Sequence, residues 1–235
     1  MNMFKTITSK GEDTRDRIYN AALALFRERG FDATTMRDVA AAAGMSLGAA
    51  YHYYPSKDAI VLAYYDRVSR EHARRVAAEA APQKSLAARL GVAFRSKLEI
   101  LRDDRPLMGA LLRFAGDPKH PLSFFGPATR QHRLESMAVF TVAVGDERLP
   151  DDLARLAPVA LWALHMGLLL FFLHDSSAGA RRTAALTTGA IDLVVVAFKL
   201  ARLPLLRSLR RRVVTLLDDA KLLPDLHDID LARVS

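Results

Sequence analysis

The fold is decided by the stretch TMRDVAAAAGMSLGAAYHY, residues 35–53. Thr35, with Asp38 three residues later, has the spacing of a capping box at the start of a short helix that Gly44 ends. Ser46 can cap a second helix almost at once. Two short helices separated by a turn of about three residues define a helix-turn-helix, and Ser46 opens its second helix.

Helical signals continue on both sides of this motif. Upstream, a set of apolar residues falls on one helical face: Ile18, Ala22, Leu25 and Phe26. Gly30 supplies a C-terminal stop for that helix. Downstream, Pro55 ends the motif, and Ser56 opens a long helix that should reach about Ala80.

The remaining chain also has the pattern of helices, because no run alternates like a half-buried strand. Further helices are expected near residues 84–102, 105–115, 127–144, 152–174, 178–202 and 205–222, divided by Gly and Pro breakers. The predicted fold is therefore all-α, with a small N-terminal unit of three helices before a larger helical body.

Composition limits the possible functions. The 235 residues are 51% hydrophobic and 26% charged, as in ordinary globular proteins, and they contain no cysteine. Disulfides, thiolate metal sites and a cysteine nucleophile are thereby excluded. The net charge of +8 suggests a polyanionic partner, but residues 1–80 contribute only +2 of it. A nucleic-acid interface must then depend on local arrangement rather than on bulk charge.

The second helix of the motif has features that packing alone does not require. Gly48 in its first turns costs about 1 kcal/mol relative to alanine, and a smooth surface for a closely approaching molecule would offset that cost. Tyr51, His52 and Tyr53 can reach phosphates or base edges from a helix in the major groove. The alternative is a packed helix, which we favour for Leu47, Ala50 and Tyr54.

Lys57 gives a second indication, because a cation in the first turn of a helix opposes the helix dipole. A DNA phosphate bound by Lys57 and the free N–H groups of that helix end would compensate. Thr35, at the start of its own helix, can bind a phosphate through its hydroxyl and N–H groups. The alternative for Lys57 is a solvated surface lysine.

These motifs resemble a known family over residues 12–60. Gly30-Phe31, Thr34-Thr35, Ala43-Gly44-Met45-Ser46, Gly48, Tyr51-His52-Tyr53-Tyr54 and Ser56-Lys57-Asp58 are similar, in order and spacing, to the DNA-binding domain of TetR-family transcriptional regulators. The resemblance implies an all-α homodimer whose third helix reads a palindromic operator. It also implies a C-terminal domain that binds a small-molecule inducer and dimerises through its last long helices. Most members of the family are repressors, so repression is the expected activity.

The resulting assignment divides the chain into a tail (1–11), a helix-turn-helix domain (12–60) and an effector-binding and dimerisation domain (61–235). The predicted DNA-binding residues are Thr35, Ser46, Leu47, Gly48, Ala49, Tyr51, His52, Tyr53 and Lys57. The partners are double-stranded operator DNA, an unidentified and largely apolar effector, and a second copy of the chain. An alternative is a helical ligand-binding or adaptor protein whose DNA motif has lost its function.

Two sets of residues in the body are candidates for these further roles. The candidate dimer interface is Trp162, Met166, Phe171, Phe172, Ile191, Val194, Val195 and Phe198, on two unusually apolar helices. The candidate effector lining is Phe94, Leu98, Met108, Arg113, Phe114, Phe125, His132, Met137, Trp162, His165 and Met166. Internal core is the alternative for both sets. The basic stretch from Lys199 to Arg212 is expected to be a solvated helix face, with membrane or nucleic-acid contact as the alternative.

Other classes of protein fit less well. Residues 44–48 match the G-x-S-x-G nucleophile elbow with Ser46 as the nucleophile, but that elbow requires a preceding strand, and a helix is expected there. The histidines show no H-x-x-x-H pair or ligand cluster, so neither a metal site nor another cofactor is expected. Residues 1–11 lack the features of a signal peptide. Leu156–Leu173 is uncharged and could span a membrane, but a buried or interface helix explains it at less cost. A cytoplasmic protein without enzymatic activity is expected.

Overall fold

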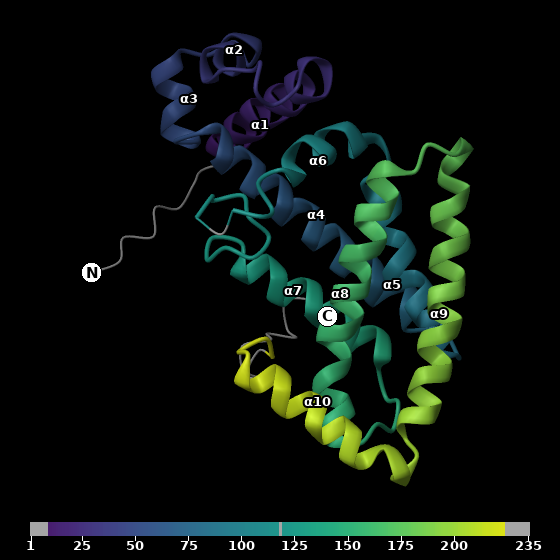
Figure 1. The fold of residues 1–235 in the computed structure, drawn as a ribbon. Coiled ribbons are helices and arrows are strands. Elements are labelled where there is room, and N and C mark those ends of the chain that lie inside the picture. The colour runs from purple at the N-terminus through teal and green to yellow at the C-terminus, as the bar shows by residue number, and fades with distance from the viewer. Residues whose placement is uncertain (1–8, 118, 224–235) are drawn as a thin grey trace. The chain divides into compact units, whose positions relative to one another are not determined.

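The computed structural model describes residues 9–117 and 119–223, and within them every regular element is helical (Figure 1). The α-helices are α1 (Ser9–Arg29), α2 (Met36–Ala42), α3 (Leu47–Tyr53), α4 (Lys57–Ala80), α5 (Leu86–Ile100), α6 (Arg105–Leu112), α7 (Arg130–Val144), α8 (Asp151–His174), α9 (Arg181–Ala201) and α10 (Arg207–Asp219). The all-α fold is confirmed, and helix ends fall within about three residues of those expected. One difference lies at the start: α1 already includes Ser9 to Gly11, which were assigned to a tail.

The helices form two compact units. Among the described residues, the N-terminal unit comprises those up to Tyr65 together with those between Asp104 and Ala128, and the body comprises Asp66–Asp103 and those from Thr129 to Leu223. Helix α4 contributes its first turns to the N-terminal unit and the remainder to the body. The domain boundary after residue 60 remains a prediction, and α6 belongs to the N-terminal unit by its contacts.

The core of the N-terminal unit follows from the apolar periodicity of α1 and from two glycine stops. Ile18, Ala22 and Phe26 are almost completely buried. Gly30 and Gly44 have φ of +90° and +65°, which L side chains rarely adopt, so both positions favour glycine. These turns bring α2 against α1 and α3 against α2 (Figure 1).

A buried carboxylate joins three elements of the N-terminal unit. Asp104 accepts hydrogen bonds from Arg27 of α1 (Nε to Oδ1, 2.6 Å) and from the Tyr64 hydroxyl of α4 (2.9 Å). Burial, reinforced by the neighbouring Asp104 charge, raises the pKa of Tyr64, so its hydroxyl stays protonated and acts as a donor. The pairing satisfies a carboxylate that would otherwise be costly to bury.

In the body, α5, α7 and α8 pack around a core that includes Phe94 and Phe140, whose ring centroids lie 5.1 Å apart. Helices α8 and α9 run side by side and antiparallel, joined by a short connection (Figure 1). Both are long and apolar enough to cross a membrane by length and composition alone. Core and interface helices pass the same test, so this finding is weak evidence for a membrane protein.

Candidate nucleic-acid interface

Helix α3 carries the residues that were predicted to read DNA. Ser46 caps it, since its hydroxyl oxygen accepts a hydrogen bond from the Ala49 N–H (3.2 Å). The buried side of α3 is Ala50, which is completely buried, and Tyr54 follows it into the core. Both positions are core, as expected. The opposite side exposes Gly48, Tyr51 and His52, with Leu47, Ala49 and Tyr53 half-buried at its edges.

Gly48 has no structural reason to be glycine. Its backbone is part of the helix and its φ is not positive. A Cβ atom placed on it would meet nothing within 4 Å beyond its own helix backbone and chain neighbours. Glycine in a helix is unfavourable by about 1 kcal/mol relative to alanine. The cost is therefore not offset by any contact within the part of the N-terminal unit that is described.

Helix α2 begins with a complete capping box. Thr35 accepts a hydrogen bond from the Asp38 N–H (3.2 Å), and the Asp38 carboxylate accepts from both the Thr35 N–H (2.8 Å) and the Thr35 hydroxyl (2.7 Å). These bonds lower the pKa of Asp38 and keep it ionised. The hydroxyl and N–H of Thr35 were expected to bind a phosphate, but both already donate to Asp38.

Lys57 is also engaged within the unit. Its ammonium donates to the Phe31 carbonyl (2.7 Å) and lies over the Phe31 ring, 4.4 Å from the centroid. It borders a surface hollow of about 360 Å³ that also includes Thr35, Tyr51 and Ser56. The hollow thus brings Lys57 and the starts of α2 and α4 beside the exposed face of α3. An ammonium has three donors, so Lys57 can bind a phosphate while it keeps the Phe31 carbonyl.

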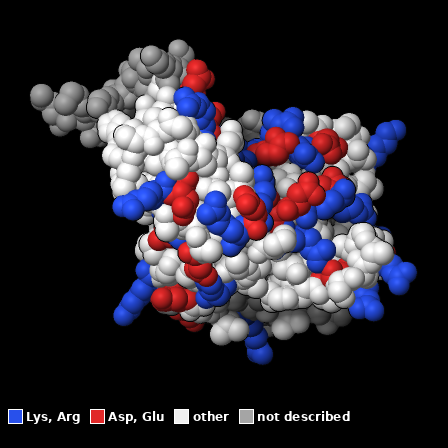
Figure 2. All heavy atoms as spheres, turned by 90° about the horizontal axis from the view of Figure 1, so that it is seen from above, with Lys and Arg blue, Asp and Glu red and all other residues white. Residues whose placement is uncertain are grey.

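The face shown in Figure 2 has no large field of charge of one sign. Basic and acidic side chains are interspersed on it. One basic residue near the motif was not predicted as a DNA contact: Arg37 is exposed in the first turn of α2. The first helix of a helix-turn-helix crosses the DNA backbone, so a cation there is a candidate phosphate contact. Its position two residues after the capping threonine Thr35 could have indicated this.

The structure divides the predicted effector lining between the two units. Met108, Arg113, Phe114 and Phe125 lie in the N-terminal unit, and the other members lie in the body. Arg113 binds the Asp32 carboxylate, and Phe125 is exposed. Phe94 and His165 do meet in the body, edge to face with ring centroids 5.5 Å apart. The full set is therefore not assembled within either unit.

The residues predicted to form the dimer interface fall into two groups, one buried inside the body and one at least partly exposed. Phe172, Ile191 and Phe198 are buried inside the body, so they have almost no surface for a partner and are core. Trp162, Met166, Val194 and Val195 are half-buried, and Phe171 is exposed. The face of α9 that lies open consists of other residues: Leu186, Leu193, Val196 and Leu200. The apolar pattern of α9 did not distinguish these two faces.

The basic stretch is mostly exposed, as expected for a solvated helix face: only Arg210 of its basic residues is half-buried, and Lys199, Arg202, Arg207, Arg211 and Arg212 are exposed. Arg202 pairs with Glu147 (2.7 Å), and Arg210 pairs with Asp152 (3.0 Å). Arg89 shares the same Glu147 (3.0 Å). Two arginines of the stretch thus also form ion pairs with other parts of the body, and Arg210 alone departs from a solvated face.

A capped α2, a turn at residues 43–46 and an α3 whose outer face is exposed define a helix-turn-helix DNA-binding protein. A family model described as "Bacterial regulatory proteins, tetR family" matches residues 18–64. The chain is 30% identical over 158 residues to the uncharacterized HTH-type transcriptional regulator Rv1255c of Mycobacterium tuberculosis, covering 66% of this chain and 74% of that protein. The chain therefore belongs to the tetR family and is a DNA-binding transcriptional regulator.

Two further similarities agree with this membership. The HTH-type transcriptional repressor KstR2 of Rhodococcus jostii is 44% identical over 54 residues, which are 23% of this chain and 26% of that protein. The crystal structure of a TetR-family regulator from Syntrophomonas wolfei has a TM-score of 0.61 at 15% identity, covering 79% of this chain and 96% of that one. This second likeness shows the fold alone. Proteins of the family are generally DNA-binding regulators rather than enzymes.

Proposed function

We propose that this regulator is a homodimeric repressor that binds a palindromic operator through α3 and releases it when a small molecule binds the body. The observation that carries the proposal is Gly48. The glycine lowers the stability of α3, meets no requirement of the described fold, and lies on the exposed face beside Tyr51 and His52. A surface without side chains there lets the helix approach a base edge closely.

The polar residues around Gly48 fit the same role. Tyr51, 48% exposed, carries a hydroxyl that can donate to a phosphate, and exposed His52 can reach base edges or phosphates. Lys57 and the exposed Arg37 would add phosphate contacts at the helix starts. Ser46 serves as the cap of α3, and α2 before it is a helix rather than a strand, so we propose no catalytic role for it.

The test is selection of duplexes from a random DNA pool by the purified full chain, at one stated salt concentration near physiological. Enrichment of a single inverted repeat is the expected result. Tyr51→Ala should lose the enriched sequence, while the control Tyr19→Phe, at a buried position of α1, should retain it. The selection is repeated with a cell extract added as a source of small molecules. Recovery of only salt-sensitive, sequence-independent binding in both selections would contradict the proposal.

The dimer would form through the open face of α8 and α9. Leu186, Leu193 and Leu200 are spaced seven residues apart and lie on one side of α9, each at least 45% exposed. Exposed apolar patches of this kind mark protein interfaces more often than free surface. Two-fold pairing would place one α3 on each side of an inverted repeat. Operator binding also implies a cytoplasmic location.

The effector would bind in the interior of the body. Buried polar atoms there lack a hydrogen-bond partner: His72 Nδ1, Ser96 Oγ, His165 Nε2 and Thr187 Oγ1. Such atoms are costly to bury unless something bonds them. The imidazoles of His72 and His165 lie 5.6 Å apart, beside Phe94. A largely apolar molecule with one or two polar groups fits these surroundings. A small-molecule screen for release from the selected operator would identify it, and His165→Phe should then reduce the response.

A further inference from the structure

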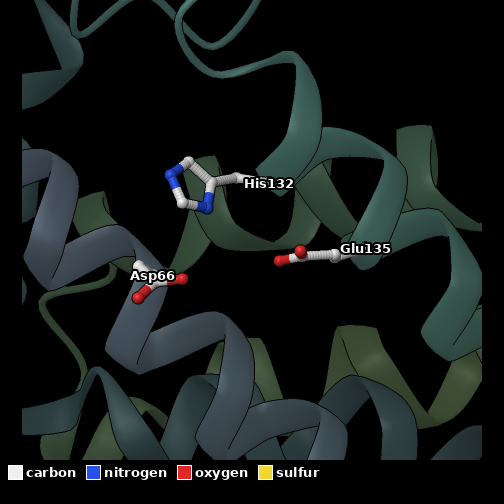
Figure 3. A group of neighbouring side chains, drawn as sticks. All are labelled: Asp66, His132 and Glu135. Atoms are coloured by element: carbon white, nitrogen blue, oxygen red, sulfur yellow. The ribbon is translucent and has the colours of Figure 1, made fainter. Parts of the chain in front are cut away.

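Three side chains with donor atoms for a cation converge in the body (Figure 3). Asp66 extends from α4, and His132 and Glu135 extend from α7 toward it. One donor atom from each lies within 4.8 Å of the other two. All three side chains are half-buried. Asp66 is far in sequence from the other two residues, so the spacing of the histidines alone did not indicate the cluster.

The spacing is close to that of a coordination shell. His132 and Glu135 are three residues apart on α7, so they project from the same side of the helix. Two ligand atoms on one ion, each about 2.1 Å from it, can be no more than about 4.2 Å apart. A separation of up to 4.8 Å therefore closes by small side-chain rotations, without movement of the helix backbones. One imidazole and two carboxylates form a donor set that suits borderline divalent ions.

Charged neighbours fix how tightly such an ion can bind. Arg70 pairs with Asp66 (2.5 Å), and Gln131 donates to Glu135 (3.1 Å). Lys97 lies near Glu135, and burial lowers the pKa of Lys97 to about 8 although Glu135 opposes that shift. An ion must compete with Arg70 for Asp66, so affinity should be moderate.

We propose that Asp66, His132 and Glu135 bind a divalent transition-metal cation of the zinc type, with at least one coordination position left for water or a ligand atom. The site stands on these residues alone and is independent of operator binding. Since Asp66 belongs to α4 and the other two ligands to α7, a bound ion would connect these helices within the body. Mg²⁺ should bind much more weakly, because it prefers oxygen ligands and retains its waters.

The experiment is calorimetric titration of Zn²⁺ into the full chain, freed of any histidine tag and treated with chelator. One ion per chain is expected. His132→Ala and Glu135→Gln should each weaken binding at least tenfold, whereas Glu79→Gln, an exposed carboxylate elsewhere on α4, should leave it unchanged. Arg70→Ala should tighten binding several-fold, because it removes the cation that competes for Asp66, and its largely exposed side chain makes misfolding no concern.

A second measurement keeps the proposal testable if a ligand variant is poorly folded. Co²⁺ bound to the unaltered chain should give visible absorption bands, and equimolar Zn²⁺ should abolish them. Circular dichroism of each variant reports its helix content independently of metal. Absence of Zn²⁺ binding at millimolar concentration overturns the proposal. So does binding that is equally strong in folded His132→Ala and Asp66→Asn variants. Neither result would bear on operator selection, which is a separate measurement.

Discussion

At the scale of single residues, Gly48 is a position where substitution should affect folding stability and DNA binding in opposite directions. Since a Cβ there meets nothing within the described chain, Gly48→Ala should raise the free energy of unfolding, by up to about 1 kcal/mol. The same methyl group faces outward on α3 and should obstruct DNA, so operator affinity should fall at least tenfold. Urea denaturation and fluorescence anisotropy with the selected operator measure the two effects.

The opposite signs of the two effects make this test specific. Gly109→Ala is the matched control, because Gly109 lies within helix α6 of the same unit and its Cβ would also meet nothing within 4 Å. That variant should gain stability with no change in operator affinity. Unchanged DNA affinity in Gly48→Ala would sink the assignment of α3 as the recognition helix.

Lys57 shows what residue patterns alone leave open. Its position in the first turn of α4 correctly predicted that something must compensate an unfavourable charge. The structure supplies part of that compensation inside the chain, through the Phe31 carbonyl and ring. Likewise, the capping box of Thr35 was predicted from its spacing with Asp38, but the box uses the hydroxyl that was also expected to bind a phosphate. The spacing of two residues predicts a local hydrogen bond between them. Whether that bond uses a donor also expected to bind a phosphate can be seen only in the three-dimensional structure.

At the scale of elements, α9 provides a test of the proposed dimer. Leu193 is 72% exposed on the open face of α9, and a two-fold interface would use it twice. Leu193→Glu should therefore weaken dimerisation at least a hundredfold, because each buried leucine contributes about 1.5–3 kcal/mol and each glutamate would lose solvation. Sedimentation velocity over a range of concentrations measures the change.

Leu216→Glu on α10 is the control, since Leu216 is 67% exposed and has the same chemistry. It should leave the dimer intact. If Leu216→Glu dissociates the protein and Leu193→Glu does not, the interface lies on α10 and the assignment to α9 is wrong. Operator affinity should decrease only in the variant that dissociates, because two half-sites require two copies of α3.

The same helix shows why elements were easier to predict than their faces. The ends of α9 follow from local composition and breakers, and these were predicted within three residues. Which side of α9 is buried depends on α5 and α8, which it packs against. Ile191 and Phe198 turned out to be core, whereas Leu193 and Leu200 are open. An apolar helix with hydrophobic residues on most sides does not contain that information in its sequence.

At the scale of the whole molecule, contacts between residues far apart in the sequence could not be predicted from the sequence. Asp66 and Glu135 are far apart along the chain, and only the fold of the body brings their carboxylates close together. Asp104 and Arg27 are a similar case in the N-terminal unit. The helix-turn-helix, by contrast, lies within residues 35–53, so its caps, turn and exposed face could all be derived from local rules.

The body also contains two buried histidines that should make its stability depend on pH. Burial lowers the pKa of His72 from 6.5 to about 3, in spite of a hydrogen bond to the Ala93 carbonyl (2.8 Å), and burial lowers the pKa of His165 as well. An unfolded chain therefore binds protons that the folded body excludes. The contribution of these histidines to the free energy of unfolding is fully present above pH 6.5 and decreases as pH falls toward 3. His72 alone should account for about 2 kcal/mol between pH 8 and pH 5.

Urea denaturation at pH 5, 6, 7 and 8, followed by the fluorescence of Trp162, measures this dependence in the body, because Trp162 is the single tryptophan of the chain. Acidic groups contribute little to the pH dependence of stability above pH 5. Glu71 is an example: Arg74 and Arg75 lower its pKa in the folded chain to about 2, and in the unfolded chain it gains a proton only near its ordinary pKa of 4.5. His72→Gln, which cannot titrate, should reduce the slope. A slope equal to that of the unaltered chain would mean that His72 becomes protonated without unfolding, and that water reaches the interior where we place the effector.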